Sequence, residues 1–274
     1  MFVRETHGGV ATHVARELAD ATGILVAFTE RSGGHSGPPY TSLNLAAHVG
    51  DVPAAVDANR ERAFSALGIG RLRDRLVTAE QVHGVRIARV READAGSGAS
   101  AAPGSAPPMP ATDALWTRQE ALPLMLLYAD CVPVVLVQPQ ARAVAVVHAG
   151  WRGALAGIVG DAARELASVC GGSGETMAFV GPHIGACCYQ VGADIVSQFA
   201  NRFATLSRAS DRLDLAAVVT EDLVRAGVAE ERQWHLGICT AHNTEHFYSY
   251  RAEGRTGRHS ALAVLLPWSR SAFR

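Results

Sequence analysis

Three short apolar segments constrain the fold of this chain most strongly: Leu122 to Ala129, Val132 to Val137 and Ala143 to His148. Each is rich in Val, Leu or Ala and too short for a typical core helix, so the segments predict buried β-strands. Asp130 and Pro133 interrupt the longest apolar stretch, which at about 16 residues is too short to cross a bilayer. We therefore predict a globular domain built on buried strands, with no membrane partner.

Helical and strand patterns alternate along the rest of the chain. Helices are predicted for Val10 to Leu18, for residues 53–67 before Gly68, for Ala154 to Cys170 before Gly171, for Asp194 to Phe199, and for Leu215 to Ala226 behind the capping residue Asp214. Further strands are predicted for Ile24 to Phe28, Leu76 to Ala79, Val85 to Val90, Met177 to Val180, His235 to Cys239 and Ala261 to Leu266. The second and third of these strands flank a turn at residues 81–84, which suggests a hairpin or a bent pair that presents this turn. Because we find no internal repeat, heptad pattern or clear linker, we predict one compact mixed α/β (α+β) domain over residues 1–274, with β-sheets sandwiched by helices.

Residues 93–112 differ from the rest of the chain because they are almost entirely Ala, Gly, Ser and Pro. Such a composition buries little apolar surface on folding. It therefore predicts an exposed, mobile loop, and we expect that deleting residues 96–107 leaves stability nearly unchanged.

The charge composition excludes several classes of protein. The 25 basic residues nearly balance the 26 acidic ones, which leaves a net charge of -1 and predicts no nucleic-acid or membrane partner. All 25 basic residues are Arg, which excludes a lysine Schiff base and a phosphate-binding loop that ends in Lys-Ser/Thr. The five cysteines include the adjacent pair Cys187 and Cys188, and the first 20 residues lack the apolar core of a signal peptide. We therefore expect a cytoplasmic protein, as a monomer or a homodimer.

Three turns present side chains that bind metals or act as nucleophiles, each next to an apolar strand. They carry His83, Cys131 and His148, which are separated by 48 and 17 residues. Two imidazoles and one thiolate form a three-ligand zinc set, and a catalytic zinc keeps its fourth position open. The spacing alone does not exclude structural roles for these residues. A second functional alternative is a Cys131 nucleophile with His148 as its base.

Motifs over nearly the whole chain resemble one known family. They are RSGGHSGPPYTSLNL at 31–45, HVGD at 48–51, QVHG at 81–84, TDAL at 112–115, ADCVP at 129–133, HAGWRG at 148–153, CCY at 187–189, FYSYR at 247–251 and GR at 257–258. Their order resembles the family described as multicopper polyphenol oxidases or laccase-domain proteins. Members are also described as zinc-dependent purine nucleoside phosphorylases and, in some bacteria, as a peptidoglycan-editing factor.

The resemblance implies a fold, a metal site and an activity. The family's His-Cys-His triad falls on His83, Cys131 and His148, which are then both the catalytic and the metal-binding residues. Zinc is the implied metal, with copper as an alternative in the same site. The implied fold is similar to cysteine-hydrolase-like toxin domains. The implied reactions are phosphorolysis of adenosine, inosine and 5′-methylthioadenosine, with purine nucleoside and phosphate as partners, and deamination of adenosine at the same site.

Phosphorolysis requires cations for a phosphate dianion, and the planar fork of Arg suits this task. Arg152 is our first substrate-binding residue because it follows His148 in the same turn, and Arg31 is the second because it adjoins the Gly33-Gly34 turn. Asn44 either hydrogen-bonds a ligand or the metal-bound Cys131, or it satisfies loop backbone groups. We interpret Cys187 and Cys188 as buried structural residues.

Blue copper oxidases need several histidine pairs, which usually occur as His-X-His. None of the 11 histidines forms such a pair, so polyphenol oxidation is our least favoured function. The stronger alternative to phosphorolysis is a hydrolase that edits peptidoglycan precursors with Cys131 and His148.

Overall fold

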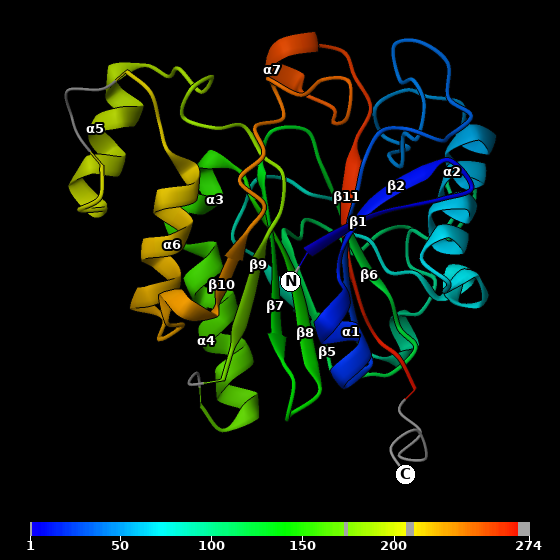
Figure 1. Ribbon diagram of the computed structural model, residues 1–274, viewed down its shortest axis with the longest axis horizontal. Coiled ribbons are helices and arrows are strands. Elements are labelled where there is room, and N and C mark those ends of the chain that lie inside the picture. The colour runs from blue at the N-terminus through cyan, green and yellow to red at the C-terminus, as the bar shows by residue number, and fades with distance from the viewer. Residues whose placement is uncertain (1, 173–174, 207–210, 268–274) are drawn as a thin grey trace.

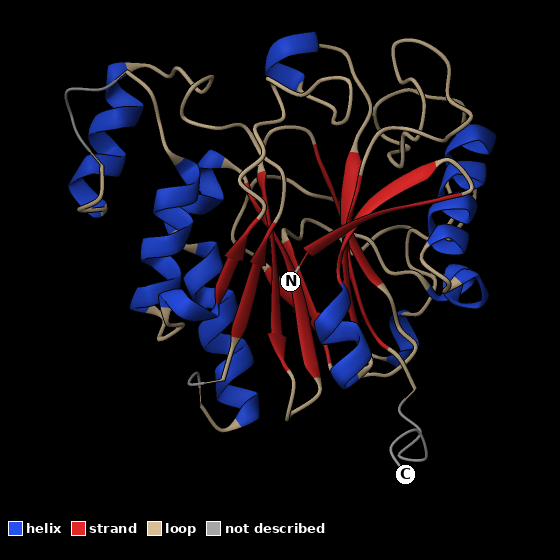
Figure 2. Ribbon diagram, viewed as in Figure 1, coloured by secondary structure: helices blue, strands red, loops and turns tan. Residues whose placement is uncertain are grey.

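Two β-sheets packed face to face form the centre of the molecule, and helices cover their outer faces (Figures 1 and 2). The computed structural model describes residues 2–172, 175–206 and 211–267. The first sheet is antiparallel throughout, with the strand order β1 (Phe2–His7), β2 (Val10–Ala15), β3 (Ile24–Thr29), β11 (His259–Leu265) and β6 (Leu124–Tyr128). Within this sheet β3, near the start of the chain, pairs with β11, near its end.

The second sheet is mixed. Its strand order is β10 (Gln233–His235), β9 (Met177–Val180), β7 (Val132–Gln138), β8 (Ala143–Ala149), β5 (Ala114–Thr117) and β4 (Ile87–Arg89). The four central strands β9, β7, β8 and β5 pair antiparallel with one another, whereas the edge strands β10 and β4 pair parallel with β9 and β5. The fold is therefore the predicted mixed α/β domain.

The helices form two outer layers. The outer face of the six-stranded sheet is covered by α3 (Trp151–Ala156) and α4 (Ile158–Cys170). Helix α6 (Leu215–Arg225) packs on α3 and α4, and α5 (Ala193–Arg202) packs on α3. The outer face of the five-stranded sheet is covered by α2 (Pro53–Ala66) and the short 3-10 helix at Gly70–Arg75. Two further short helices are α1 (Arg16–Thr22) and α7 (Tyr250–Glu253), and further 3-10 turns lie at Glu92–Asp94 and Glu230–Arg232. None of the helices in the described residues combines the length and the apolar character that a membrane span requires.

Strand β7 explains why the central segments are apolar without interruption. Val134 and Leu136 pack against the helices, while Val135 and Val137 pack against the other sheet. Successive side chains of a strand point to opposite faces, so a strand covered on both faces needs apolar residues at every position. Asp214 also caps α6 as predicted, because its carboxylate accepts a hydrogen bond from the backbone N–H of Ala217 at 3.0 Å.

The structure corrects three predictions of local structure. The helix predicted from Val10 to Leu18 is strand β2 followed by α1, because a four-residue spacing also fits a strand and both faces of β2 are buried. The predicted hairpin around residues 81–84 is wrong: Val77 pairs with Leu124, and β4 pairs with β5. The strand predicted at His235 to Cys239 overlaps β10 at a single residue, because β10 ends at His235.

Residues 93–112 make more contacts than their composition predicts. Gly98 and Ala99 are buried, and their carbonyl groups accept hydrogen bonds from the buried guanidinium of Arg60 at 2.8 and 2.7 Å. Asp57 accepts hydrogen bonds from Ser100 and Ala101. Residues 102–104 and 106–107 are exposed, so this part of the loop matches the predicted exposure.

Candidate metal centre

His83, Cys131 and His148 meet at one edge of the six-stranded sheet. Strands β7 and β8 are antiparallel and pair Val132 with Ala149, which places Cys131 at the start of β7 near His148 at the end of β8. The Cys131 Sγ lies 3.7 Å from the His83 Nε2, and the two imidazole rings meet edge to face at 4.8 Å. All three ligand atoms lie within 4.8 Å of one another. The structure thus brings together the three residues that the sequence predicted.

Asp113 organises two of these three residues. Its Oδ1 lies 2.8 Å from the His148 Nδ1, and its carboxylate accepts backbone N–H bonds from Val82, His83 and Gly84. A carboxylate partner on Nδ1 holds that nitrogen protonated and leaves Nε2 free to bind a metal. Sequence analysis quoted Asp113 within the motif at 112–115 but gave it no role.

The donor set fits a zinc ion. Two imidazole nitrogens and one thiolate are the ligand types that zinc prefers, and the supporting carboxylate is typical of such sites. Gly150 has no side chain and so leaves room for the side chains of His83 and Cys131. An added Cβ at this position would lie 2.5 Å from the His83 Cδ2 and 3.4 Å from the Cys131 Sγ. A side chain at this position would displace the ligands.

Electrostatics couples the Cys131 thiol to the imidazole of His148. Burial opposes ionisation of the Cys131 thiol, but His148 and then His83 outweigh it and lower the pKa of Cys131 to about 6. Burial likewise opposes charge on His148, but Cys131 and Asp113 raise the pKa of His148 to about 9. Cys131 is therefore a thiolate near neutral pH, which is the form that binds zinc or acts as a nucleophile.

The triad opens into a cavity of about 410 Å³, within the usual range for small-molecule sites. The triad shares this cavity with three guanidinium groups and three aromatic rings, which belong to Arg152, Arg251, Arg258, Trp151, Tyr189 and Tyr250. The cavity therefore combines a metal site with cationic and aromatic groups.

Arg152 borders the cavity as its position after His148 predicted. Its guanidinium stacks on the Trp151 ring at 4.3 Å, and its side chain is exposed. Sequence analysis missed Arg251 and Arg258, although both lie in quoted motifs. Arg251 donates to the Gln190 carbonyl at 2.9 Å and Arg258 donates to the backbone of its own loop, so neighbouring loops orient both side chains.

Arg31 lies outside this cavity. It donates to the carbonyl of Thr244 at 2.6 Å and to the Glu253 carboxylate at 2.8 Å, and it stacks on the Tyr248 ring at 4.3 Å. The adjoining Gly33 does not form an anion site either. A Cβ there would lie 2.2 Å from the Gly9 carbonyl oxygen, so the glycine allows two backbone segments to approach.

Asn44 satisfies loop groups, which was the second of its two predicted roles. Its amide donates to Ala46 and Asp51 and accepts from the backbone N–H groups of Ala46 and Arg258. Asn44 is fully buried and lies outside the residues that line the cavity.

Asp130, beside Cys131, is also used by the loops around the cavity. Its carboxylate accepts from the Thr240 hydroxyl at 2.7 Å and from the Arg251 N–H at 2.6 Å. It thereby holds the segment that carries Arg251 close to Cys131.

The structure corrects the prediction that Cys187 and Cys188 are buried. Cys187 is exposed and Cys188 is half-buried, and both lie near Cys239 and His242. Sequence analysis missed this second cluster because Cys239 and His242 lie about 50 residues away along the chain.

A two-sheet α/β domain with a His-Cys-His centre in an arginine-lined cavity is the class of protein that this fold and site define. Residues 25–266 match the family model described as "Multi-copper polyphenol oxidoreductase laccase", and the chain belongs to this family. The match confirms the resemblance that the sequence motifs indicated.

Curated relatives and solved structures agree with this assignment. The chain is 37% identical over 240 residues to a purine nucleoside phosphorylase of Streptomyces coelicolor, covering 86% of this chain and 93% of the relative. It is 36% identical to a purine nucleoside phosphorylase of Streptomyces griseus, covering 89% and 96%. The crystal structure of YlmD from Geobacillus stearothermophilus superposes with a TM-score of 0.87 at 32% identity, covering 97% of this chain and 99% of that one.

Proposed function

We propose that this protein is a zinc-dependent purine nucleoside phosphorylase that acts on adenosine, inosine and 5′-methylthioadenosine. The names of the relatives support the phosphorylase class. The observation that carries the proposal is the shared cavity, in which the His83, Cys131 and His148 triad faces the guanidinium groups of Arg152 and Arg258. Zinc is preferred to copper because the sequence offers a single His-Cys-His set and no His-X-His pairs.

Phosphorolysis sets clear demands on this cavity. A phosphate oxygen forms a bond to the ribose C1′, the C1′–N9 bond breaks, and the purine leaves with the bonding electrons and takes up a proton. The phosphate brings negative charge, and Arg152, Arg251 and Arg258 supply three cations without Lys. The rings of Trp151 and Tyr189 provide flat apolar surfaces for a purine.

The triad holds the ion that completes the site. When bound, zinc supplies a Lewis acid with one position open to water or substrate. His83, Cys131 and His148 fill the protein positions, and Asp113 keeps the His148 Nδ1 protonated. Deamination of adenosine at the same site follows from the same chemistry, since a Lewis acid also activates water for attack on C6 of the purine.

Product analysis tests the proposal. Adenosine with phosphate should give adenine and ribose 1-phosphate in equal amounts, with some inosine from deamination. Arg152→Ala should raise the KM for phosphate at least about tenfold, since hydrogen bonds to charged groups contribute about 1.5 to 3 kcal/mol. Arg89→Ala is the matched control, because Arg89 is also exposed and stacks on a tryptophan, Trp116, at 5.0 Å, yet lies outside the cavity.

The alternative activity is hydrolysis of a peptidoglycan precursor by Cys131 with His148. A nucleotide-linked muramoyl dipeptide distinguishes the two. Turnover of this peptide with no turnover of nucleosides would replace the phosphorylase proposal. Cleavage of nucleosides at equal rates with arsenate and with phosphate would support the phosphorylase proposal, since both anions fit the same set of guanidinium groups.

A further inference from the structure

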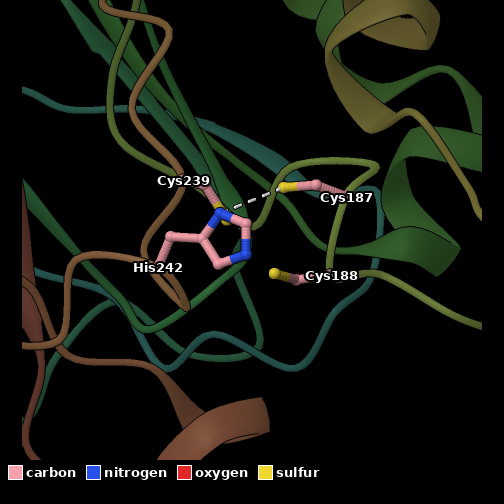
Figure 3. A group of neighbouring side chains, drawn as sticks. All are labelled: Cys187, Cys188, Cys239 and His242. Atoms are coloured by element: carbon pink, nitrogen blue, oxygen red, sulfur yellow. Dashed lines mark hydrogen bonds between the residues drawn. The ribbon is translucent and has the colours of Figure 1, made fainter.

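A second cluster of metal-binding side chains lies outside the phosphorylase cavity. It consists of Cys187, Cys188, Cys239 and His242, whose ligand atoms all lie within 4.8 Å of one another. Figure 3 shows the three thiol groups gathered around the His242 ring, with the Cys187 Sγ 3.6 Å from its Nδ1. We name these four residues the surface cluster.

The sheet topology explains why these distant residues meet. Strands β9 and β10 are parallel, with Val180 paired to His235, so the segments that follow them emerge side by side. The pairing continues beyond the strands, because His183 and Cys239 form a further parallel bridge. Backbone pairing therefore brings the segment that leads to Cys187 and Cys188 beside the segment that carries Cys239.

The backbone at Gly185 allows the sulfur atoms of Cys187 and Cys239 to approach each other. The N–H of Gly185 donates to the Cys239 Sγ at 3.2 Å. A Cβ at Gly185 would lie 3.2 Å from the Cys187 Sγ and 3.4 Å from the Cys239 Cβ, so the glycine leaves the two sulfurs free to converge. Adjacent cysteines such as Cys187 and Cys188 rarely form a disulfide with each other, but both can bind one ion.

We propose that the surface cluster is a second zinc site, with all four coordination positions filled by Cys187, Cys188, Cys239 and His242. Three thiolates and one imidazole form a Cys₃His set, which is typical of structural zinc. In a tetrahedron with zinc–sulfur bonds of about 2.3 Å, sulfur atoms lie about 3.8 Å apart. The present spacing needs only small side-chain adjustments to reach this arrangement.

Such a site would brace one wall of the phosphorylase cavity. Tyr189 lines the cavity directly after Cys188, and Thr240 follows Cys239 and donates to Asp130 beside Cys131. A zinc ion in the surface cluster would tie these two loops together. With four protein donors it leaves no position for substrate, so its role is structural.

Metal counting on intact protein tests this proposal independently of any enzyme activity. Protein purified without chelators should carry two zinc ions per chain by native mass spectrometry and elemental analysis. Cys239→Ser and the matched variant Cys131→Ser should each retain one, and the double variant none. His242→Ala removes an exposed side chain with little risk to folding, and should release the second zinc to a chromogenic chelator at least about tenfold faster.

Two results would overturn the proposal. One is a single zinc per chain that Cys131→Ser removes and Cys239→Ser leaves in place, which would leave the phosphorylase proposal intact. The other is an intact mass two hydrogens below that of the reduced chain, with the lost thiols mapped to the surface cluster. This result would show a disulfide in place of the metal.

Discussion

The triad and the surface cluster lie at the same edge of the six-stranded sheet, yet their surroundings differ. Strand β9 is antiparallel to β7, so the chain after Val180 leaves the sheet beside Cys131. The triad has three donors, a carboxylate behind them and a cavity in front. The surface cluster has four donors, three of them sulfurs, with Cys187 exposed and Cys188 and Cys239 half-buried.

The two clusters use the same ligand types, His and Cys, for two different roles. Three donors leave a coordination position for chemistry, whereas four donors close the ion off. A carboxylate behind a histidine also tunes and orients a reactive site. The number of donors and the space in front of them therefore distinguish the two roles better than the ligand types do.

Replacing single ligands should give the largest contrast between the clusters. His83→Ala and Cys131→Ala should each lower phosphorolysis about 1000-fold or more, because Lewis-acid stabilisation contributes several kcal/mol. Cys239→Ser should change it less than about tenfold. Steady-state assays with zinc analysis check this. Full activity of a zinc-free preparation, with His83→Ala much milder than Cys131→Ala, would assign Cys131 the role of nucleophile instead.

Asp113→Asn should have the next largest effect. Loss of the charge behind His148 should weaken zinc binding by about 10-fold to 100-fold, measured by competition with a chelator. Asp57→Asn is the control, because Asp57 also accepts several hydrogen bonds, from Ser100, Ala101 and Arg73, far from either cluster. An equal loss of zinc in both variants would show a general effect on folding.

An ion pair of Glu30 should give a pH-dependent effect on stability. Glu30 lines a second, shallow pocket together with Cys187, Cys239 and His242 of the surface cluster. Glu30 is buried, and hydrogen bonds from His13 and Arg4 outweigh this burial and lower the pKa of Glu30 to about 2. Because this pKa is below the unfolded value near 4.5, the pair stabilises the fold above pH 4.5 and loses this contribution as the pH falls toward 2.

Glu30→Gln should therefore lower the free energy of unfolding by about 2 to 3 kcal/mol at pH 7. Urea unfolding at pH 7, 4.5 and 3 measures the difference from the unmodified protein, which should shrink below pH 4.5. A difference that stays constant with pH would attribute the loss to packing rather than charge.

The smallest effect is expected at the tip of the 93–112 loop, far from both clusters. Deleting residues 102–105 should change the free energy of unfolding by less than about 1 kcal/mol, because shortening a loop changes closure entropy little. The larger deletion of residues 96–107 should destabilise the protein by several kcal/mol, since it leaves the buried Arg60 without two acceptors. Matched thermal melts of the two deletions test this distinction.

Patterns within single segments predicted the fold where burial alone determines the structure. The apolar runs at β6, β7 and β8 and the cap at Asp214 needed no knowledge of the rest of the chain. The helix predicted for Val10 to Leu18 was wrong because the spacing of its apolar residues fits both a strand and a helix. Only the burial of both faces of β2 distinguishes the two.

The candidate site also has residues that sequence motifs predicted and residues that only the fold revealed. The triad was found through motifs, whereas the spacing of its members carried little information. The roles of Asp113 and Arg258 depend on contacts across the sheet edge, which no local pattern contains. Arg31 was chosen for its neighbouring glycines, but a glycine allows the backbone itself to approach as readily as an anion.

Gly150 limits which sequence changes the metal centre can tolerate during evolution. Every substitution at this position adds at least a Cβ, which would meet the His83 ring at 2.5 Å. Loops around the cavity can vary to change the substrate, but any substitution of Gly150 would displace the His83 ring. Lineages that change chemistry on this scaffold are therefore expected to lose the triad and the glycine together, or to keep both.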